Sequence, residues 1–332
     1  MLGCGASGLM LGAHLNKKAL FIEHNSFGGA KVKASGGAKC NVTNERVSSK
    51  NYLGDESFTS FALKNFSNKD TLNFLENYGI YPNIRTLGQY FCNSSKDVLN
   101  ALNKANRKHE FLFSTKIESI SYKNEKFLLK SHDKTFTCKK LIVASGGVSF
   151  ATLGATDIGY KIAEHFGHEI KAPTPALVGL TLQKEQFWMK ELSGIAFLVE
   201  VKIKDFVYRE NLLFSHKGIS GPVVLNTSLR FDKGSFEVDF LPEFTFNEKM
   251  WNDKKQLTYV LPLPKRFIKA FLDSHNLIDK PLKNYTNEEK KKIISLKNYI
   301  MSPSGTFGLR RAEVTKGGVK TSDINEQTFE SK

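Results

Sequence analysis

The chain has 332 residues, of which 40% are hydrophobic and 24% are charged, and its formal net charge is +15. This composition predicts a folded, soluble protein that is long enough for two or more domains. The sequence contains no apolar run of the roughly 18 residues that a transmembrane helix needs, which argues against a membrane span.

The positive charge allows two explanations. A polyanionic partner such as RNA would favour a basic surface. The alternative is codon bias, because the chain is rich in Lys, Asn and Phe and poor in Arg, the residue that a specific nucleic-acid site uses most. The lysines are scattered, with one triplet at residues 290–292. We favour codon bias and keep RNA as an alternative.

Four cysteines (Cys4, Cys40, Cys92 and Cys138) lie far apart, without a Cys-x-x-Cys pair. This usage is typical of a reducing cytoplasm and argues against zinc or a disulfide framework. The histidines show no ligand spacing, so we expect no metal site. Residues before Cys4 lack the basic and apolar regions of a signal peptide.

The first motif is Gly3-x-Gly5-x-x-Gly8, followed by a helix over residues 9–15 and a short buried strand over residues 19–23. Glycines at these positions permit a tight turn and let the backbone approach a pyrophosphate at the start of a helix. Glu23 stands 20 residues after Gly3, where an acid binds a ribose diol. The motif predicts a dinucleotide site that includes Gly3, Gly5, Ala6, Ser7, Gly8, Glu23 and His24.

Residues 24–50 read as a long Gly-, Lys- and Asn-rich loop, and loops of this length are uncommon unless they have a function. Residues 35–44 within it would provide backbone N–H groups for a phosphate or a flavin edge. We expect Cys40 to have a packing role. The cofactor-binding residues predicted here are Ser35, Gly36, Gly37, Lys39, Cys40, Asn41 and Thr43.

Further along, residues 58–65, 70–78 and 96–108 read as helices, and residues 111–138 as a β-meander. Residues 141–147 predict a buried strand that ends at Ser145, Gly146 and Gly147, a third candidate cofactor segment. Asp157 is expected to cap a helix that continues to Phe166. The chain is strand-like from 173 to 240 and helical from 247 to 297. Residues 313–315 read as a last strand.

His216 lies between Ser215 and Lys217, shortly before a Gly-Pro turn. A histidine here is a candidate proton donor to a substrate, or alternatively a turn residue that caps local backbone. Ser220 does not lie in a nucleophile elbow, which argues against a serine hydrolase.

Taken together, these segments resemble the BaiN/YhiN-like flavoproteins, also described as aminoacetone oxidase-type FAD-binding enzymes. The matching segments, which span the chain, are residues 3–10, 35–44, 141–147, 156–160, 173–177, 213–222 and 312–319. Two residues differ from the family's usual loop, since Ala38 and Lys39 stand where a Gly and an Arg are common. The family also has a full first strand, here reduced to Met1 and Leu2, and a glycine-rich segment beyond Lys332. We therefore expect a chain that is truncated at both ends.

The resemblance implies an α/β fold, with a Rossmann-like FAD-binding domain into which a β-rich domain and a helical subdomain are inserted. The domains expected are 1–172 for FAD, with the meander 111–138 included; 173–245 with 298–316 for the β-rich substrate domain; 246–297 for the helical subdomain; and 317–332 for the return to the FAD domain.

The function that the resemblance implies is a cytoplasmic, FAD-dependent oxidoreductase that takes hydride from NAD(P)H and reduces a conjugated C=C bond. The substrate would be an enone-like small molecule or, because uracil contains the same conjugated unit, a uridine in RNA. His216 is the candidate catalytic residue. The alternative is a non-catalytic RNA-binding protein or an inactive fragment of such a flavoprotein.

Overall fold

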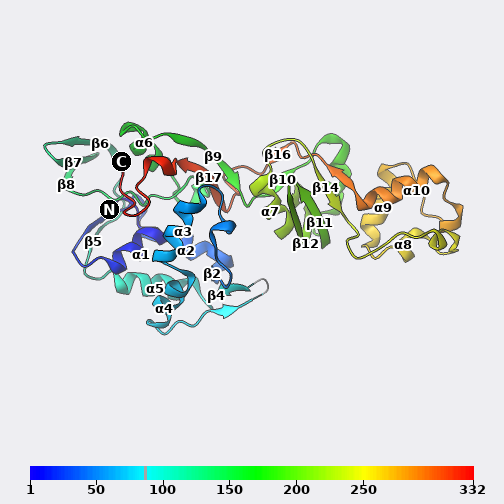
Figure 1. The fold of residues 1–332 in the computed structure, drawn as a ribbon, viewed down its shortest axis with the longest axis horizontal. Helices are drawn as coiled ribbons and strands as arrows, with labels where there is room; N and C mark the ends of the chain where they lie inside the picture. The colour runs from blue at the N-terminus through cyan, green and yellow to red at the C-terminus, as the bar shows by residue number, and fades with distance from the viewer. Residues whose placement is uncertain (86–87) are drawn as a thin grey trace. The chain divides into compact units, whose positions relative to one another are not determined.

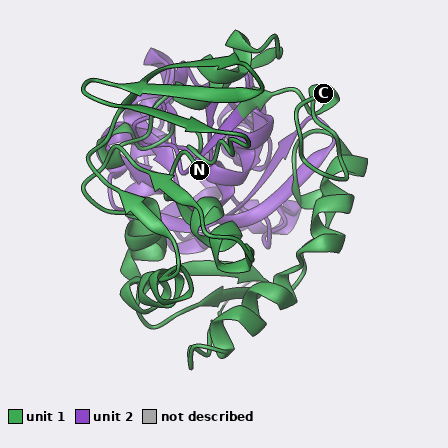
Figure 2. Ribbon diagram, turned by 90° about the vertical axis from the view of Figure 1, so that its left-hand side faces the viewer, with its two compact units in different colours: residues 1–173, 317–332 green, residues 174–316 purple. Residues whose placement is uncertain are grey.

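The computed structural model describes residues 1–85 and 88–332, which form two compact units (Figure 1, Figure 2). Unit 1 contains Met1–Pro173 and Gly317–Lys332, and unit 2 contains Thr174–Lys316. The chain therefore leaves unit 1, completes unit 2 and returns. The two crossings run through β9 (Ile170–Ala176) and β17 (Val314–Val319), which pair with each other.

A short parallel sheet forms the centre of unit 1. Strand β1 (Leu20–Ile22) pairs in parallel with β5 (Glu110–Leu112). On the other side of β1, Leu2 forms parallel bridges to Ile22 and Val143. The Ile22 N–H donates to the Met1 carbonyl at 2.9 Å, and the Ala144 N–H donates to the Leu2 carbonyl at 2.8 Å. The order β5, β1, Leu2, Val143 is that of a Rossmann-like half.

Helices pack against this sheet and against each other. Helix α1 (Ala6–His14) contacts α5 (Ser95–Ala105), which also contacts α2 (Ala30–Ala34) (Figure 1). Gly12 permits this packing, because a Cβ there would lie 2.1 Å from Asn106 Oδ1. The buried Asn106 amide donates to two backbone carbonyls at 2.8 Å. Further helices of unit 1 are α3 (Glu56–Asn65), α4 (Asn68–Glu76) and α6 (Ile158–His165).

Two antiparallel sheets and several short 3-10 segments complete unit 1. One sheet has the order β2, β4, β3 and the other the order β6, β7, β8. Their bounds are β2 (Asn41–Asn44), β3 (Asn83–Ile84), β4 (Gln89–Phe91), β6 (Ile117–Lys123), β7 (Lys126–Ser131) and β8 (Thr135–Cys138). The 3-10 segments are Ser35–Ala38, Ser49–Asn51, Ala151–Leu153 and Thr321–Asp323.

The structure corrects the expectation of one long irregular loop over residues 24–50. This segment contains α2, the 3-10 segment Ser35–Ala38 and strand β2. Strand β2 exists because β4, about 50 residues away, supplies its hydrogen-bonding partner. Local composition, rich in glycine and lysine, does not reveal such a distant partner.

Three further expectations in unit 1 were wrong in detail. Residues 111–113 do not belong to the meander, because β5 pairs with β1 instead. Residues 141–147 do not form a buried strand: Val143 makes an isolated bridge and is 41% exposed. Asp157 makes no capping hydrogen bond with its side chain, which instead forms an ion pair with Lys161 at 3.0 Å.

In unit 2, a seven-stranded sheet has the order β15, β14, β11, β12, β13, β10, β16. Strands β15 and β16 form the two edges of this sheet, and the three residues that connect them can span at most about 14 Å. The two edges must therefore lie near each other, so the sheet curls towards closure. The bounds are β10 (Leu180–Thr181), β11 (Ala196–Ile203), β12 (Phe206–Ser215), β13 (Gly218–Ser220), β14 (Phe236–Asp239), β15 (Tyr299–Met301) and β16 (Gly305–Thr306).

Helices accompany this sheet and share its core. Helix α7 (Pro222–Arg230) contacts β12 and corrects the expectation of strands throughout 173–240. Phe267 of α9 is fully buried, and its ring lies 5.0 Å from those of Phe197 and Phe240. The remaining bounds are α8 (Leu257–Val260), α9 (Lys265–Ser274) and α10 (Asn287–Ile294), with 3-10 segments Lys184–Leu192, Glu248–Asn252, Leu282–Asn284 and Ser295–Lys297. Among the described residues, no helix has the length and apolar character needed to cross a bilayer.

Candidate functional site

The turn over residues 3–8, which we call the phosphate turn, is fixed by two close backbone approaches. Gly3 has a φ of +101°, and a Cβ on it would lie 2.5 Å from the Ala144 carbonyl oxygen. A Cβ on Gly8 would lie 2.4 Å from the Gly3 carbonyl oxygen. The first and third glycines of the motif are therefore required by packing within the protein itself.

The middle glycine differs from the other two. Gly5 has an ordinary φ of −79°, and a Cβ on it would meet no atom within 4 Å. It precedes α1, whose first residues Ala6 and Ser7 are exposed. The first N–H groups of a helix lack intrahelical partners and carry partial positive charge, which suits a phosphate. Packing within the protein therefore does not explain Gly5.

Glu23 is buried at the end of β1 and joins several backbone segments. Its Oε2 accepts a hydrogen bond from the Cys4 N–H at 2.9 Å, and its Oε1 accepts one from the Asn25 N–H at 3.0 Å. The ring Nδ1 of the exposed His24 lies 3.1 Å from the same Oε1. Glu23 thus orients the phosphate turn directly, a role that the sequence did not suggest. Its role towards a ribose stays a prediction.

The segment 35–44 has an unusual backbone that turns one side chain inward. Gly36, Gly37, Ala38 and Cys40 all have positive φ, between 51° and 69°. The Cys40 N–H donates to the Ser35 carbonyl at 3.0 Å and closes the loop. The Cys40 side chain is buried, whereas residues 36–39 and 41 are exposed. The N–H groups of these exposed residues include those predicted to contact a cofactor.

Cys40 packs in the same apolar cluster as Cys92, and the Cys92 N–H donates to the Cys40 carbonyl at 3.1 Å. The sequence indicated no neighbour for Cys40, because these cysteines are brought together by the β2–β4 pairing. Burial raises the pKa of both thiols, to about 11 for Cys92. This supports the expected packing role of Cys40. Thr43, also predicted to contact the cofactor, lies opposite Tyr90 in this pairing.

The third predicted segment, Ser145 to Gly147, lies beside the phosphate turn. Its neighbour Ala144 contacts Gly3, as described above. A Cβ on Gly159 would lie 2.4 Å from Ser145 Oγ, which places Ser145 against the start of α6. Gly146 has a φ of +73°, and the Gly147 carbonyl accepts a hydrogen bond from Lys31 Nζ at 3.2 Å.

Lys31 and its neighbours belong to the site although the sequence analysis missed them. The Gly29 N–H donates to the Cys4 carbonyl at 2.8 Å, which anchors α2 on the phosphate turn. Lys31, two residues later, reaches Gly147. The sequence signal was the Gly28-Gly29-Ala30-Lys31 stretch after Glu23. The structure therefore brings together the phosphate turn, Glu23, the start of α2 and the segment 145–147, all within unit 1.

His216 occupies a different part of the protein. It is exposed in the tight turn between β12 and β13 of unit 2. This turn needs Gly218, whose φ is +148° and whose Cβ would lie 2.2 Å from the Leu180 carbonyl oxygen. Ser215 Oγ donates to the Gly218 carbonyl at 3.1 Å. Local backbone contacts thus explain why Gly218 and Ser215 occupy their positions in this turn. His216 lies in the same turn.

Comparison with known proteins identifies the family. The model of the HI0933-like protein Rossmann domain matches residues 1–332. The chain belongs to this family. It is 32% identical over 351 residues to the ribosomal RNA dihydrouridine synthase of Escherichia coli (strain K12), with 100% of this chain and 88% of the relative covered.

The comparisons include two more distant similarities. The 3-dehydro-bile acid delta(4,6)-reductase of Clostridium scindens is 27% identical over 371 residues, with 100% of this chain and 89% of the relative covered. Glycine oxidase from Geobacillus kaustophilus is a solved structure with a TM-score of 0.35 and 11% identity, covering 53% of this chain and 61% of that chain. The expectations of a BaiN/YhiN-like, Rossmann-type flavoprotein and of an FAD-dependent oxidoreductase are confirmed by the family match.

The residues of the phosphate turn fit an FAD pyrophosphate, and Gly5 provides the sharpest test. We expect Gly5→Ala to lower FAD affinity by about tenfold or more, because the added methyl occupies the space into which the ligand approaches. Stability should hardly change, since the methyl meets no protein atom. FAD titration by fluorescence and urea denaturation measure the two quantities. Gly305→Ala, where the nearest atom to a Cβ is 3.6 Å away, is the matched control. Equal FAD affinity in Gly5→Ala and the wild type would contradict this assignment.

Cys4 gives the site a pH signature. Burial, and secondarily the negative charge of Glu23, raises the pKa of Cys4 from 9.0 to about 12. Above pH 9 the unfolded thiol ionises and the folded one does not, so the unfolded state binds fewer protons. The free energy of unfolding should then fall by up to about 1.4 kcal/mol per pH unit up to pH 12. Urea denaturation at pH 8 and pH 11 should show a smaller decline for Cys4→Ala than for the wild type. Identical declines would show that Cys4 is not involved.

Proposed function

We propose that this protein is an FAD-dependent oxidoreductase that uses NAD(P)H to reduce the conjugated C5=C6 bond of a uridine in ribosomal RNA. The observation that carries the proposal is the 32% identity, over the whole chain, to a ribosomal RNA dihydrouridine synthase. The similarity to a bile acid delta(4,6)-reductase supports the same reaction type, because that name also describes reduction of a conjugated bond. A cytoplasmic location follows from such a substrate.

The residues of unit 1 would hold the cofactor. The N–H groups at the start of α1, beside the open Gly5, would bind the pyrophosphate. The carboxylate of Glu23 is held in place by two backbone N–H groups, so that it is already oriented for a ribose hydroxyl. The exposed residues 36–39 would contact the flavin half, and Lys39 adds positive charge there.

The chemistry requires a hydride at C6 of the uracil and a proton at C5. When bound, FAD supplies hydride transfer, taking the hydride from NAD(P)H and delivering it to the conjugated bond. The protein must orient the base and deliver the proton. An exposed imidazole, such as that of His216, is a side chain that can deliver this proton.

The charge distribution supports an RNA substrate over a small molecule. Residues 246–297 contain twelve Lys and Arg against six Asp and Glu, a net charge of +6 in 52 residues. Several of these cations, including Lys254, Lys255 and Lys269, are exposed. Codon bias alone would spread the excess charge evenly. A net positive charge of this kind favours contact with a phosphate backbone.

The decisive activity test uses the purified protein with bound FAD. We expect that incubation with NADH or NADPH and ribosomal RNA rich in unmodified uridine converts uridine to dihydrouridine, a gain of two hydrogens that nucleoside mass spectrometry detects. A steroid enone serves as the competing substrate class. Reduction of the enone with no dihydrouridine would replace RNA by a small molecule. Salt-sensitive RNA binding without reduction of either would favour a non-catalytic RNA-binding protein.

His216 has its own prediction. His216→Ala should lower kcat by about 100-fold or more, the usual effect of removing a general acid, while FAD content stays unchanged. Ser215→Ala is the control, because that side chain has a local backbone partner. Wild-type turnover by His216→Ala would remove this histidine from the reaction.

A further inference from the structure

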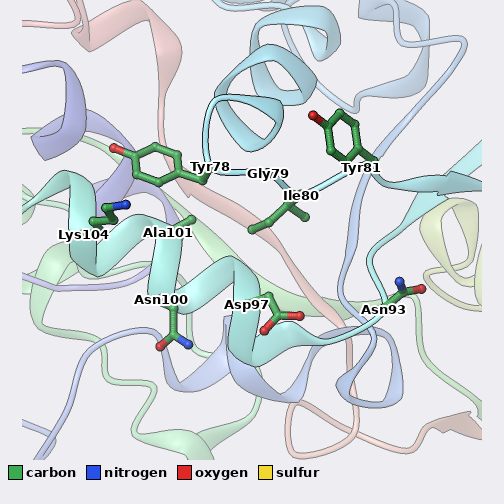
Figure 3. Close-up of a pocket in the computed structure, with 9 residues that line it drawn as sticks. All are labelled: Tyr78, Gly79, Ile80, Tyr81, Asn93, Asp97, Asn100, Ala101 and Lys104. Atoms are coloured by element: carbon green, nitrogen blue, oxygen red, sulfur yellow. The ribbon is translucent and has the colours of Figure 1, made fainter.

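Unit 1 contains a cavity of about 440 Å³ that none of the predicted cofactor-binding residues lines. Its wall consists of the chain that leaves α4, the residue Asn93 and one face of α5 (Figure 3). The volume lies within the range of small-molecule sites, about 300–1,000 Å³. The cavity therefore has room for a ligand that is separate from the dinucleotide at the phosphate turn.

A rigid turn places the aromatic side chains of the cavity. The Gly79 N–H donates to the Glu76 carbonyl at 2.8 Å, and the Ile80 N–H donates to the Leu75 carbonyl at 3.0 Å. With Gly79 at a φ of +73°, these bonds form a Schellman motif that ends α4. The motif fixes the backbone of Gly79 and Ile80, which lie between the two tyrosines.

The two tyrosines offer ring faces of different kinds. Tyr81 is 71% exposed, and no described aromatic ring packs against it. Tyr78 lies across the cavity (Figure 3), with its ring 5.7 Å from Lys104 Nζ. Single-stranded nucleic acids stack their bases on exposed aromatic rings, and lysines neutralise their phosphates.

The remaining polar groups suit the edge of a base. Asp97, Asn100 and Lys104 share one face of α5, at positions i, i+3 and i+7. The side chains of Asn93, Asp97 and Asn100 make no hydrogen bond to another residue that the structure describes. Carboxamides pair in bidentate fashion with base edges, and a carboxylate accepts from exocyclic amino groups. A phosphate alone would call for more cations, and a lipid for a more apolar wall.

We propose that this cavity binds a nucleotide of single-stranded RNA, with the base stacked on Tyr81 and its edge bonded to Asn93, Asp97 or Asn100. The site would hold the RNA at a point other than the reacting uridine. The proposal rests on the proposed function for the identity of the polymer as RNA. It does not depend on the reaction, because binding here involves no electron transfer.

The test measures binding of short, fluorescently labelled single-stranded RNAs of uniform sequence to the FAD-containing protein by anisotropy. Tyr81→Ala should weaken binding by about 5- to 100-fold, the range for loss of a stacking aromatic, with little change in the salt dependence. Because Tyr81 is mostly exposed, the substitution should not disturb folding. Tyr122→Ala, which removes a tyrosine that is 52% exposed in β6 of unit 1, is the matched control and should keep wild-type affinity.

A second variant tests the base contacts. Asn100→Ala should reduce the difference in affinity between adenine, cytosine and uracil polymers. Unchanged affinity in Tyr81→Ala, or an equal loss in Tyr122→Ala, would overturn the proposal. Dihydrouridine formation separates the two claims. RNA binding that depends on Tyr81, without dihydrouridine formation, would contradict the proposed function but support this binding site. Dihydrouridine formation at an unchanged KM in Tyr81→Ala would support the proposed function but contradict this binding site.

Discussion

The close approach of Gly3 to Ala144 is the constraint on which the site depends. No side chain fits at Gly3, because a Cβ would lie 2.5 Å from the Ala144 carbonyl oxygen. Leu2, immediately before it, bridges Ile22 and Val143 at the centre of the parallel sheet. Two segments separated by about 140 residues thus meet backbone to backbone, which sets the phosphate turn and the segment 145–147 side by side. This packing exists without any ligand.

Glu23 and α2 extend this arrangement. The Glu23 carboxylate holds the Cys4 and Asn25 N–H groups, and the Gly29 N–H binds the Cys4 carbonyl. Such charge-assisted hydrogen bonds are stronger than those between neutral groups. The phosphate turn is therefore held on both sides before a ligand arrives, and little ordering is left to oppose binding. This preorganisation explains why a short turn, preceded by a very short sheet segment, still has a defined geometry.

The sequence predicted those features whose cause is local. The spacing of Gly3, Gly5 and Gly8 predicted the turn and α1, and the family resemblance predicted the Rossmann-like fold. The features it missed depend on distant partners. Strand β2 needs β4, Cys40 meets Cys92 through that pairing, and Lys31 reaches Gly147 across more than 100 residues. The cavity beside α5 was missed for the same reason, since Tyr81 and Asn100 carry no motif that links them.

The central claim is that unit 1 holds FAD, and the visible absorption spectrum of the purified 332-residue protein tests it most directly. We expect a yellow protein whose released chromophore is FAD in a one-to-one ratio with the chain. A colourless protein that is folded by circular dichroism and gains no flavin on incubation with FAD would show that unit 1 does not hold this cofactor. The preorganised turn would then have another ligand or none.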